Sequence, residues 1–199
     1  MEVSRLLAQL GPSVATAQAE QVHGGSVALL GAVHGVVAPI PGCDGLWTDQ
    51  AHRALLIRTA DCVPIFFAEP SRGVIGLAHV GWRGVRQQLP VRMISACVGA
   101  YRVMPAQLWV AIGPAIRACC YEVGQEFRAC FGSFVRQQRG RVTCDLVGAA
   151  MEQLTRCGIR RQRVADCARC TACESDHWFS LRREGPSTGR LVSVIMRRP

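Results

Sequence analysis

The chain has 199 residues, 49% of them hydrophobic, and a mean hydropathy of +0.17. This length fits one domain with a substantial core, and the composition excludes a disordered chain. The net charge is +9 and all 23 basic residues are Arg, scattered along the chain without interleaved aromatic residues. We therefore interpret the Arg excess as GC-rich codon usage and expect no nucleic-acid partner, with an Arg-lined surface for phosphate or nucleic acid as the alternative.

No apolar run approaches the ~18 residues that a transmembrane helix needs, so we expect no membrane partner. Residues 1–5 show neither the basic nor the apolar region of a secretion signal, and we predict a cytoplasmic protein. Eleven Cys are many for that compartment. In a reducing cytosol, the default interpretation is buried, reduced side chains rather than disulfides.

The first half of the chain predicts one short helix and then mainly strands. A Ser N-cap, apolar residues at helical spacing and a Gly stop predict the helix, and short apolar runs between polar, Gly or Pro residues predict the strands. The helix is expected at residues 4–10, and the strands at 15–22, 26–30, 54–59, 63–67 and 74–78. The first two strands flank a turn at Gly24-Gly25, and residues 70–73 predict a hairpin turn.

The second half predicts more helix. Helices are expected at residues 84–98, 125–134 and 145–157, and strands at 108–112 and 191–196. Asp145 suits the start of the last helix and Gly158 its stop. Because strands come in clusters with helices between them, the pattern favours an α+β fold over strict βαβ alternation. No linker or repeat divides residues 1–199, so we expect a single domain.

Two chemically active side chains follow directly on predicted strands. Cys62 comes after the strand at 54–59, and His79 comes 17 residues later, after the strand at 74–78. A His at a strand end, followed by glycines, suits a metal ligand or a base, although it could equally cap the strand. The alternative for Cys62 is a buried structural thiol. Asp61, next to an apolar run, needs a partner for its carboxylate.

His23 also lies at the end of a predicted strand and is followed by Gly. Two His and one Cys make a plausible zinc set, because three protein ligands leave a fourth position open for water or substrate. The ligands are 39 and 17 residues apart in the sequence, and this wide spacing alone is a weak signal.

The motifs of the chain resemble the YfiH-type laccase-domain family from about residue 18 to the C-terminus. Each motif alone is unspecific, but their combination in this order is highly specific. The motifs are QVHG at 21–24, TADCVPIFF at 59–67, GLAHVGWRG at 76–84, IGPAIRACCYEVG at 112–124, CT at 170–171 and WFSLRREGPSTGR at 178–190.

The resemblance implies a layered α/β sandwich with mixed β-sheets and a purine nucleoside enzyme, of a family first named polyphenol oxidases. Phosphorolysis of adenosine, inosine, guanosine and methylthioadenosine, and deamination of adenosine, are the implied activities, with purine nucleosides and phosphate as small-molecule partners. The implied metal ligands are His23, Cys62 and His79, and the metal is zinc, with copper as the alternative. We also expect a monomer or small homo-oligomer without the family's usual N-terminal leading segment.

The mechanistic hypothesis is a metal that polarises water or phosphate against a bound purine nucleoside. Asp61 is the candidate acid/base beside Cys62, and Arg83 is the candidate phosphate ligand. The alternative for Arg83 is an ion pair with Asp61 or another acid. The alternatives for the whole chain are a metal-binding relative with weak or no activity and a structural or binding role, or a copper-dependent polyphenol oxidase. Five His are too few for several copper centres.

Cys167, Cys170 and Cys173 form a CxxCxxC run that resembles part of an iron–sulfur ligand set. No fourth Cys followed by Pro completes the run, so a cluster or a second zinc is the less favoured interpretation. We expect Cys119-Cys120 to serve packing. Of the CxxCxxC run, the resemblance to the family accounts only for Cys170, with its neighbour Thr171, whereas Cys120 lies in the motif quoted at 112–124.

Overall fold

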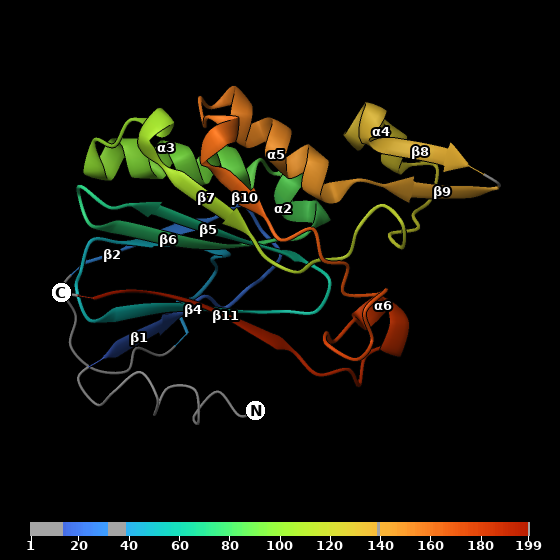
Figure 1. Ribbon diagram of the computed structural model, residues 1–199, viewed down its shortest axis with the longest axis horizontal. Helices are drawn as coiled ribbons and strands as arrows, with labels where there is room; N and C mark the ends of the chain where they lie inside the picture. Colours follow the sequence, from blue (N-terminus) through green and yellow to red (C-terminus); the bar gives the residue numbers. More distant parts are fainter. Residues whose placement is uncertain (1–13, 32–38, 139, 199) are drawn as a thin grey trace.

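The computed structural model describes residues 14–31, 39–138 and 140–198, and these form three layers (Figure 1). Helices cover one face of a six-stranded sheet, and a three-stranded sheet lies against its other face. The predicted layered α/β sandwich with mixed sheets is thereby confirmed. The predicted helix at 4–10 lies outside the described residues. None of the described helices is long and apolar enough to cross a membrane.

The six-stranded sheet contains most of the strands that position the candidate site. Its order is β10 (Val164–Asp166), β7 (Trp109–Ile112), β5 (Val63–Glu69), β6 (Val74–Val80), β3 (Gly45–Thr48) and β2 (Val27–Leu30). The outer pairs β10–β7 and β2–β3 are parallel, and the inner pairs are antiparallel. The predicted turn at 70–73 joins β5 to β6, where Gly73 has a φ of 62° and its N–H donates to the Pro70 carbonyl (3.2 Å).

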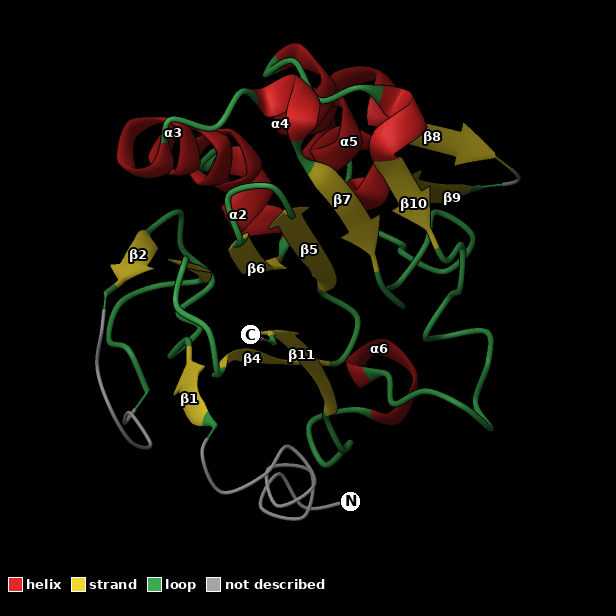
Figure 2. Cartoon of the chain, turned by 60° about the vertical axis from the view of Figure 1, so that its left-hand side comes forward, coloured by secondary structure: helices red, strands yellow, loops and turns green. Residues whose placement is uncertain are grey.

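The three-stranded sheet consists of β1 (Ala15–Gln18), β4 (Arg53–Thr59) and β11 (Leu191–Arg197), with β4 in the middle. Two departures from the predicted strands matter for the site. β1 ends at Gln18 rather than at residue 22, because Gln21 and His23 have positive φ angles of 68° and 59°. β1 and β2 also lie in different sheets (Figure 2), so the segment between them crosses from one layer to the next.

The helices α2 (Trp82–Arg86), α3 (Leu89–Tyr101) and α5 (Leu146–Arg156) lie on the outer face of the six-stranded sheet (Figure 1). The short helix α4 (Phe127–Phe131) and a hairpin of β8 (Val135–Gln138) and β9 (Arg141–Cys144) lie nearer the edge. The short helix α6 (Leu181–Glu184) lies beside β11 instead. The single helix predicted at 84–98 is wrong: it is broken at Gln88, whose φ is 58°. Asp145 caps α5 as predicted, accepting from the Gly148 N–H (2.8 Å).

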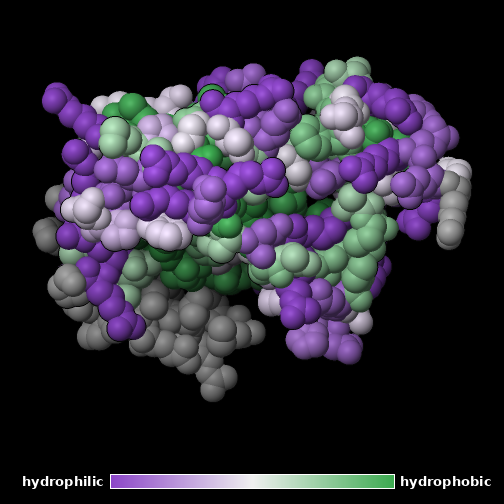
Figure 3. Space-filling model, turned by 45° about the horizontal axis from the view of Figure 1, so that its top comes forward, coloured by the Kyte–Doolittle hydropathy of each residue, from purple (hydrophilic) through white to green (hydrophobic). Residues whose placement is uncertain are grey.

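The strands β3 and β6 of the six-stranded sheet are buried on both faces, and this fixes β6 in place. One apolar cluster lies between the sheet and the helices, where Trp47 Nε1 donates to the Met93 carbonyl (3.0 Å). A second cluster, with Leu46, Leu55 and Leu77, lies between the two sheets. All seven residues of β6 are buried, so its side chains have little freedom to move. On the outside, the surface is largely hydrophilic, with apolar side chains gathered in a furrow (Figure 3).

Candidate metal centre and its cavities

The structure brings His23, Cys62 and His79 together in what we call the three-ligand site. His23 lies in the crossing segment after β1, Cys62 directly before β5, and His79 near the end of β6. One ligand atom from each residue lies within 4.8 Å of the others. The two imidazole rings meet edge to face, with 4.7 Å between their centroids. Three positions far apart in the sequence therefore converge, two beside the paired strands β5 and β6 and one on the segment that crosses between the sheets.

Asp44, directly before β3, orients both histidines and was not singled out from the sequence. It is fully buried, and its Oδ1 lies 2.7 Å from His79 Nδ1. The backbone N–H groups of His23 and Gly24 donate to its two oxygens (3.0 and 2.7 Å). Because a carboxylate only accepts, His79 carries its proton on Nδ1, and Nε2 remains for a ligand. Asp44 thus also holds His23 in its left-handed backbone conformation.

Hydrogen bonds among the ligand side chains shift their pKa values, and any proton on His79 Nε2 would be released as zinc binds. Burial raises the pKa of the Cys62 thiol, but hydrogen bonds with His23 and His79 outweigh burial and bring it to about 7. Burial lowers the pKa of His79, but hydrogen bonds with Asp44 and Cys62 raise it to about 9. The pKa of Asp44 is lowered because hydrogen bonds from His79, Gly24 and His23 exceed the effect of burial.

The donor set fits zinc. Zinc binds thiolate and neutral imidazole, and two His with one Cys are three protein ligands of the kind found in catalytic sites. The second nitrogen of His79 is tied to a carboxylate, as metal-ligating histidines usually require. A fourth ligand position would face open space, because the site borders two cavities.

The two cavities differ in their lining. The first, of about 540 Å³, is polar and contains Arg58 and Arg190 with amide and carboxylate side chains. The second, of about 460 Å³, is lined by Trp82 and Tyr121 with two arginines. The residues common to both are His23, Ala60, Cys62 and Leu181. The three-ligand site therefore lies at the junction, with one polar and one aromatic compartment beside it.

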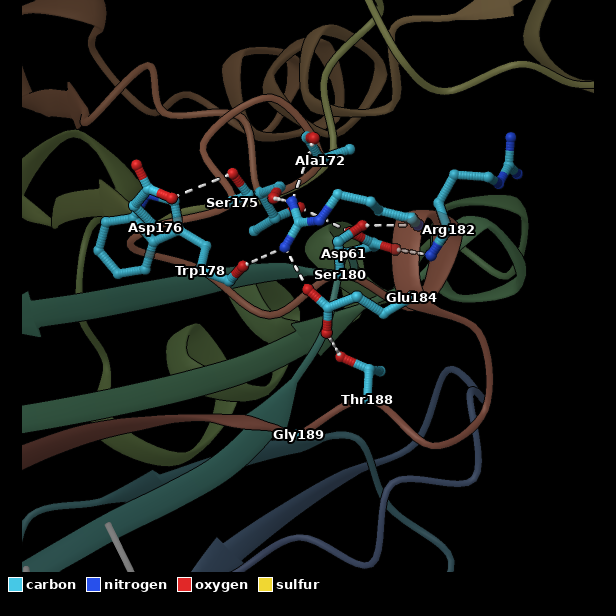
Figure 4. Close-up of polar contacts among 12 residues, drawn as sticks. Asp61, Ala172, Ser175, Asp176, Trp178, Ser180, Arg182, Glu184, Thr188 and Gly189 are labelled. Carbon is cyan, nitrogen blue, oxygen red and sulfur yellow. Dashed lines mark hydrogen bonds and ion pairs between the residues drawn. The ribbon is translucent and has the colours of Figure 1, made fainter.

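Asp61 lies in the wall of the second cavity and binds two loops together (Figure 4). Its Oδ1 accepts from the Thr171 hydroxyl (2.6 Å), and its Oδ2 accepts from the Arg182 N–H (2.7 Å). Its carbonyl accepts from the Ile116 N–H (2.9 Å). The buried Asp61 carboxylate thus has hydrogen-bond partners, as we expected from its position next to an apolar run.

Arg83 is exposed on α2 and lines the second cavity. Its guanidinium lies over the ring of Trp82, 4.5 Å from the centroid. Among the described residues, no carboxylate forms an ion pair with it, so the alternative pairing with Asp61 is not formed. Arg182 lies similarly over Tyr121, at 5.3 Å, and donates to the Glu122 carbonyl (2.6 Å).

Several residues of the cavities were not singled out from the sequence: Arg58, Trp82, Tyr121, Arg182 and Arg190. All but Arg58 lie inside the motifs quoted above, and their motif membership was the signal that could have identified them. The expected packing role of Cys119-Cys120 is wrong, because Cys119 is exposed and Cys120 only half-buried.

Comparison with known proteins places the chain in a family. A family model described as multi-copper polyphenol oxidoreductase laccase matches residues 2–198. The chain belongs to this family. Within this laccase-like family, the chain is 34% identical to "Purine nucleoside phosphorylase YlmD" of Geobacillus stearothermophilus, covering 90% of this chain and 71% of that one. It is 36% identical to a protein of Deinococcus radiodurans named purine nucleoside phosphorylase, covering 96% and 74%.

Solved structures of laccase-like relatives share the fold. The crystal structure of YlmD from Geobacillus stearothermophilus superimposes with a TM-score of 0.84 at 33% identity, over 92% of this chain and 74% of that one. The Bacillus licheniformis protein YfiH gives a TM-score of 0.82 at 27% identity, with the same coverage.

Proposed function

We propose that this laccase-family protein is a zinc-dependent purine nucleoside phosphorylase that accepts adenosine, inosine, guanosine and methylthioadenosine. The observation that carries the proposal is the three-ligand site at the junction of two cavities. The names of its relatives support the same reaction class. His23, Cys62 and His79 would hold the ion, His79 through Nε2, and the ion would supply a Lewis acid at the junction.

Phosphorolysis forms a bond between a phosphate oxygen and the anomeric carbon of the ribose, and breaks the bond from that carbon to the purine nitrogen. The purine leaves with the electron pair and takes up a proton. We assign phosphate binding to Arg83, whose exposed fork of N–H donors lines the second cavity. The nucleoside then extends into the first cavity, where Gln18, Glu20 and Thr188 offer hydrogen-bonding groups.

Asp61 is the acid/base group that we assign to the reaction. Its carboxylate lies next to Cys62 in sequence and in the cavity wall, and the Thr171 hydroxyl gives it a partner for proton exchange. The same group would serve adenosine deamination, in which water replaces the amine and ammonia leaves. We propose this as a second activity of the site.

Product analysis tests the function. Metal-quantified protein is incubated with adenosine and phosphate, and adenine with ribose 1-phosphate, or inosine with ammonia, is measured. We expect Cys62→Ala to lose both turnover and the metal of the three-ligand site. Cys157→Ala, at another half-buried Cys, is the matched control and keeps both. Full activity of Cys62→Ala would overturn the assignment, and bound zinc without turnover in the wild type would favour the inactive relative.

The phosphate assignment has its own test. Arg83→Ala is expected to raise the KM for phosphate by about tenfold, because a charge-assisted contact contributes roughly 1.5–3 kcal/mol. The KM for adenosine should change much less. Arg86→Ala is the matched control, since Arg86 is exposed on the same helix but lines neither cavity. An unchanged phosphate KM in Arg83→Ala contradicts the assignment.

A further inference from the structure

Four cysteines outside both cavities form a second group of metal-ligating side chains, which we call the four-cysteine cluster. Its members are Cys119, Cys120, Cys170 and Cys173, and their sulfur atoms all lie within 4.8 Å of one another. Cys119 Sγ is 3.6 Å from both Cys170 Sγ and Cys173 Sγ, and Cys120 Sγ is 3.3 Å from Cys173 Sγ.

The topology explains why distant cysteines meet. β7 and β10 are parallel neighbours, so the loops that follow them leave the same edge of the sheet. The pairing continues beyond the strands through a bridge between Ala115 and Cys170. Cys119-Cys120 follow on one loop, and the CxxC pair of Cys170 and Cys173 lies on the other. Cys167 belongs to the same sequence run but lies outside the cluster.

The spacing of the sulfur atoms fits one tetrahedral ion. A Zn–S bond of about 2.3 Å places neighbouring sulfurs of a tetrahedron about 3.8 Å apart. A disulfide would need about 2.05 Å, so these thiols are not paired with one another. An iron–sulfur cluster distributes its thiolates over different irons, and this tight set does not provide that separation. A CxxC pair is also a frequent half of a structural zinc site.

The local hydrogen bonds support the same interpretation. The backbone N–H of Cys170 donates to the Glu174 carboxylate (3.3 Å). The loop that carries the CxxC pair is itself fixed by Arg183, whose guanidinium donates to the carbonyls of Thr171 (2.6 Å), Ala172 and Trp178 (Figure 4). Hydrogen bonds therefore hold the loop that carries Cys170 and Cys173.

We propose that Cys119, Cys120, Cys170 and Cys173 bind a structural zinc ion. Each thiol gives up its proton as zinc binds, and no electron is transferred. Four protein ligands fill the tetrahedron and leave no open position, so the site has no catalytic role. The ion would bind the loop of Ile116 and Tyr121 to the loop of Thr171, which holds the Asp61 carboxylate in the wall of the second cavity. The proposal is independent of the proposed function.

Metal analysis tests the proposal on the full chain. We expect about two zinc ions per wild-type chain, one at each site, and loss of about one in the double variant Cys170→Ser/Cys173→Ser. Cys167→Ser is the matched control from the same CxxCxxC run and should keep both. Unchanged zinc in the double variant, or an equal loss in Cys167→Ser, would overturn the proposal.

Cobalt substitution and alkylation keep the test decisive if the double variant does not fold. Cobalt loaded into Cys62→Ala, whose three-ligand site is disrupted, should show the sulfur-to-cobalt charge-transfer and strong visible bands of a tetrahedral tetrathiolate. In the wild type, a chelator should increase alkylation of the four cluster cysteines, but not of exposed Cys130 and Cys167. The proposed zinc site would be contradicted if the cobalt bands were absent. It would also be contradicted if the chelator did not change the alkylation of the four cluster cysteines.

Discussion

The three-ligand site and the four-cysteine cluster both contain buried and exposed ligands, but they are supported differently. His79 is a buried residue of β6 and is oriented by the Asp44 carboxylate, whereas the four cysteines lie on two loops that follow β7 and β10. The first site has three ligands and two neighbouring cavities, and the second has four ligands. In our proposals this is the difference between an open, catalytic zinc site and a closed, structural one.

The largest expected effect concerns the carboxylate that supports only the first site. Asp44→Asn removes the charge that holds His79 Nδ1–H and the His23 backbone. We expect the zinc affinity of the three-ligand site to fall about 10–100-fold, as for other residues that orient metal ligands. Competition with a chelator measures this. Asp49→Asn, at the other end of β3, is the control, and an equal effect of the two variants would contradict the role of Asp44.

The next effect concerns the loop that lies between the two sites. Thr171→Val keeps the shape of the side chain but leaves Asp61 Oδ1 buried without its hydroxyl donor. We expect the free energy of unfolding to fall by about 1–3 kcal/mol, measured by urea denaturation. Thr155→Val on the exposed side of α5 should change it by less than about 0.5 kcal/mol. An equal change in the free energy of unfolding for both variants would show that the hydrogen bond from Thr171 to Asp61 does not stabilise the fold.

A smaller effect is expected from crowding at the three-ligand site. A methyl group on Gly81 would lie 3.1 Å from Cys62 Sγ and 3.3 Å from His23 Cδ2. The φ of Gly81 is −85°, so Ala fits the backbone and only this contact changes. Gly81→Ala should weaken zinc binding by about 1 kcal/mol. Gly99→Ala, where a methyl group meets nothing within 4 Å, should leave it unchanged. Equal zinc binding in both would argue against a tightly packed site.

The smallest effect concerns an ion pair beside the four-cysteine cluster. Arg117 holds Asp166 through a hydrogen-bonded ion pair at 2.6 Å, which lowers the pKa of that carboxyl below its ordinary 3.8. Because the folded pKa is the lower one, the stabilisation is present above pH 3.8 and is lost as pH falls through the folded value. Asp166→Asn should cost under about 1 kcal/mol at pH 7, since the pair is partly exposed.

The pH dependence of the stability difference distinguishes loss of this ion pair from other destabilising effects of the substitution. The difference in urea midpoint between wild type and Asp166→Asn should shrink as pH is lowered below the ordinary pKa of the carboxyl. A difference that stays constant at acidic pH would mean that the substitution acts through something other than the ion pair with Arg117.

Sequence patterns could predict the elements with a strong local signal. β5 and β6 are continuous apolar runs joined by a clear turn, and α5 has an Asp cap and a Gly stop. β3 was not predicted, because its four residues, Gly-Leu-Trp-Thr, are too few to show an alternating hydrophobic pattern. They form a strand by pairing with β2 and β6. The break before α3 had one usable signal, the Pro in its first turn.

The residues of the two sites also differ in whether a local sequence pattern could predict them. The positions of His23, Cys62 and His79 could be singled out because each follows a predicted strand and lies in a family motif, although the strand before His23 ends earlier than predicted, at Gln18. Asp44 could not, because its partners come from other strands. The four-cysteine cluster depends on the parallel pairing of β7 with β10, which brings two pairs of cysteines about fifty residues apart to one edge.

The most direct test measures zinc content, thermal stability and phosphate-dependent adenine release together in Cys62→Ala and in Cys170→Ser/Cys173→Ser. We predict that each variant loses about one zinc ion. Cys62→Ala should lose adenine release and keep most of its stability, whereas the double variant should melt at lower temperature and still release adenine. Adenine release at the wild-type rate by Cys62→Ala would contradict the assignment of catalysis to the three-ligand site.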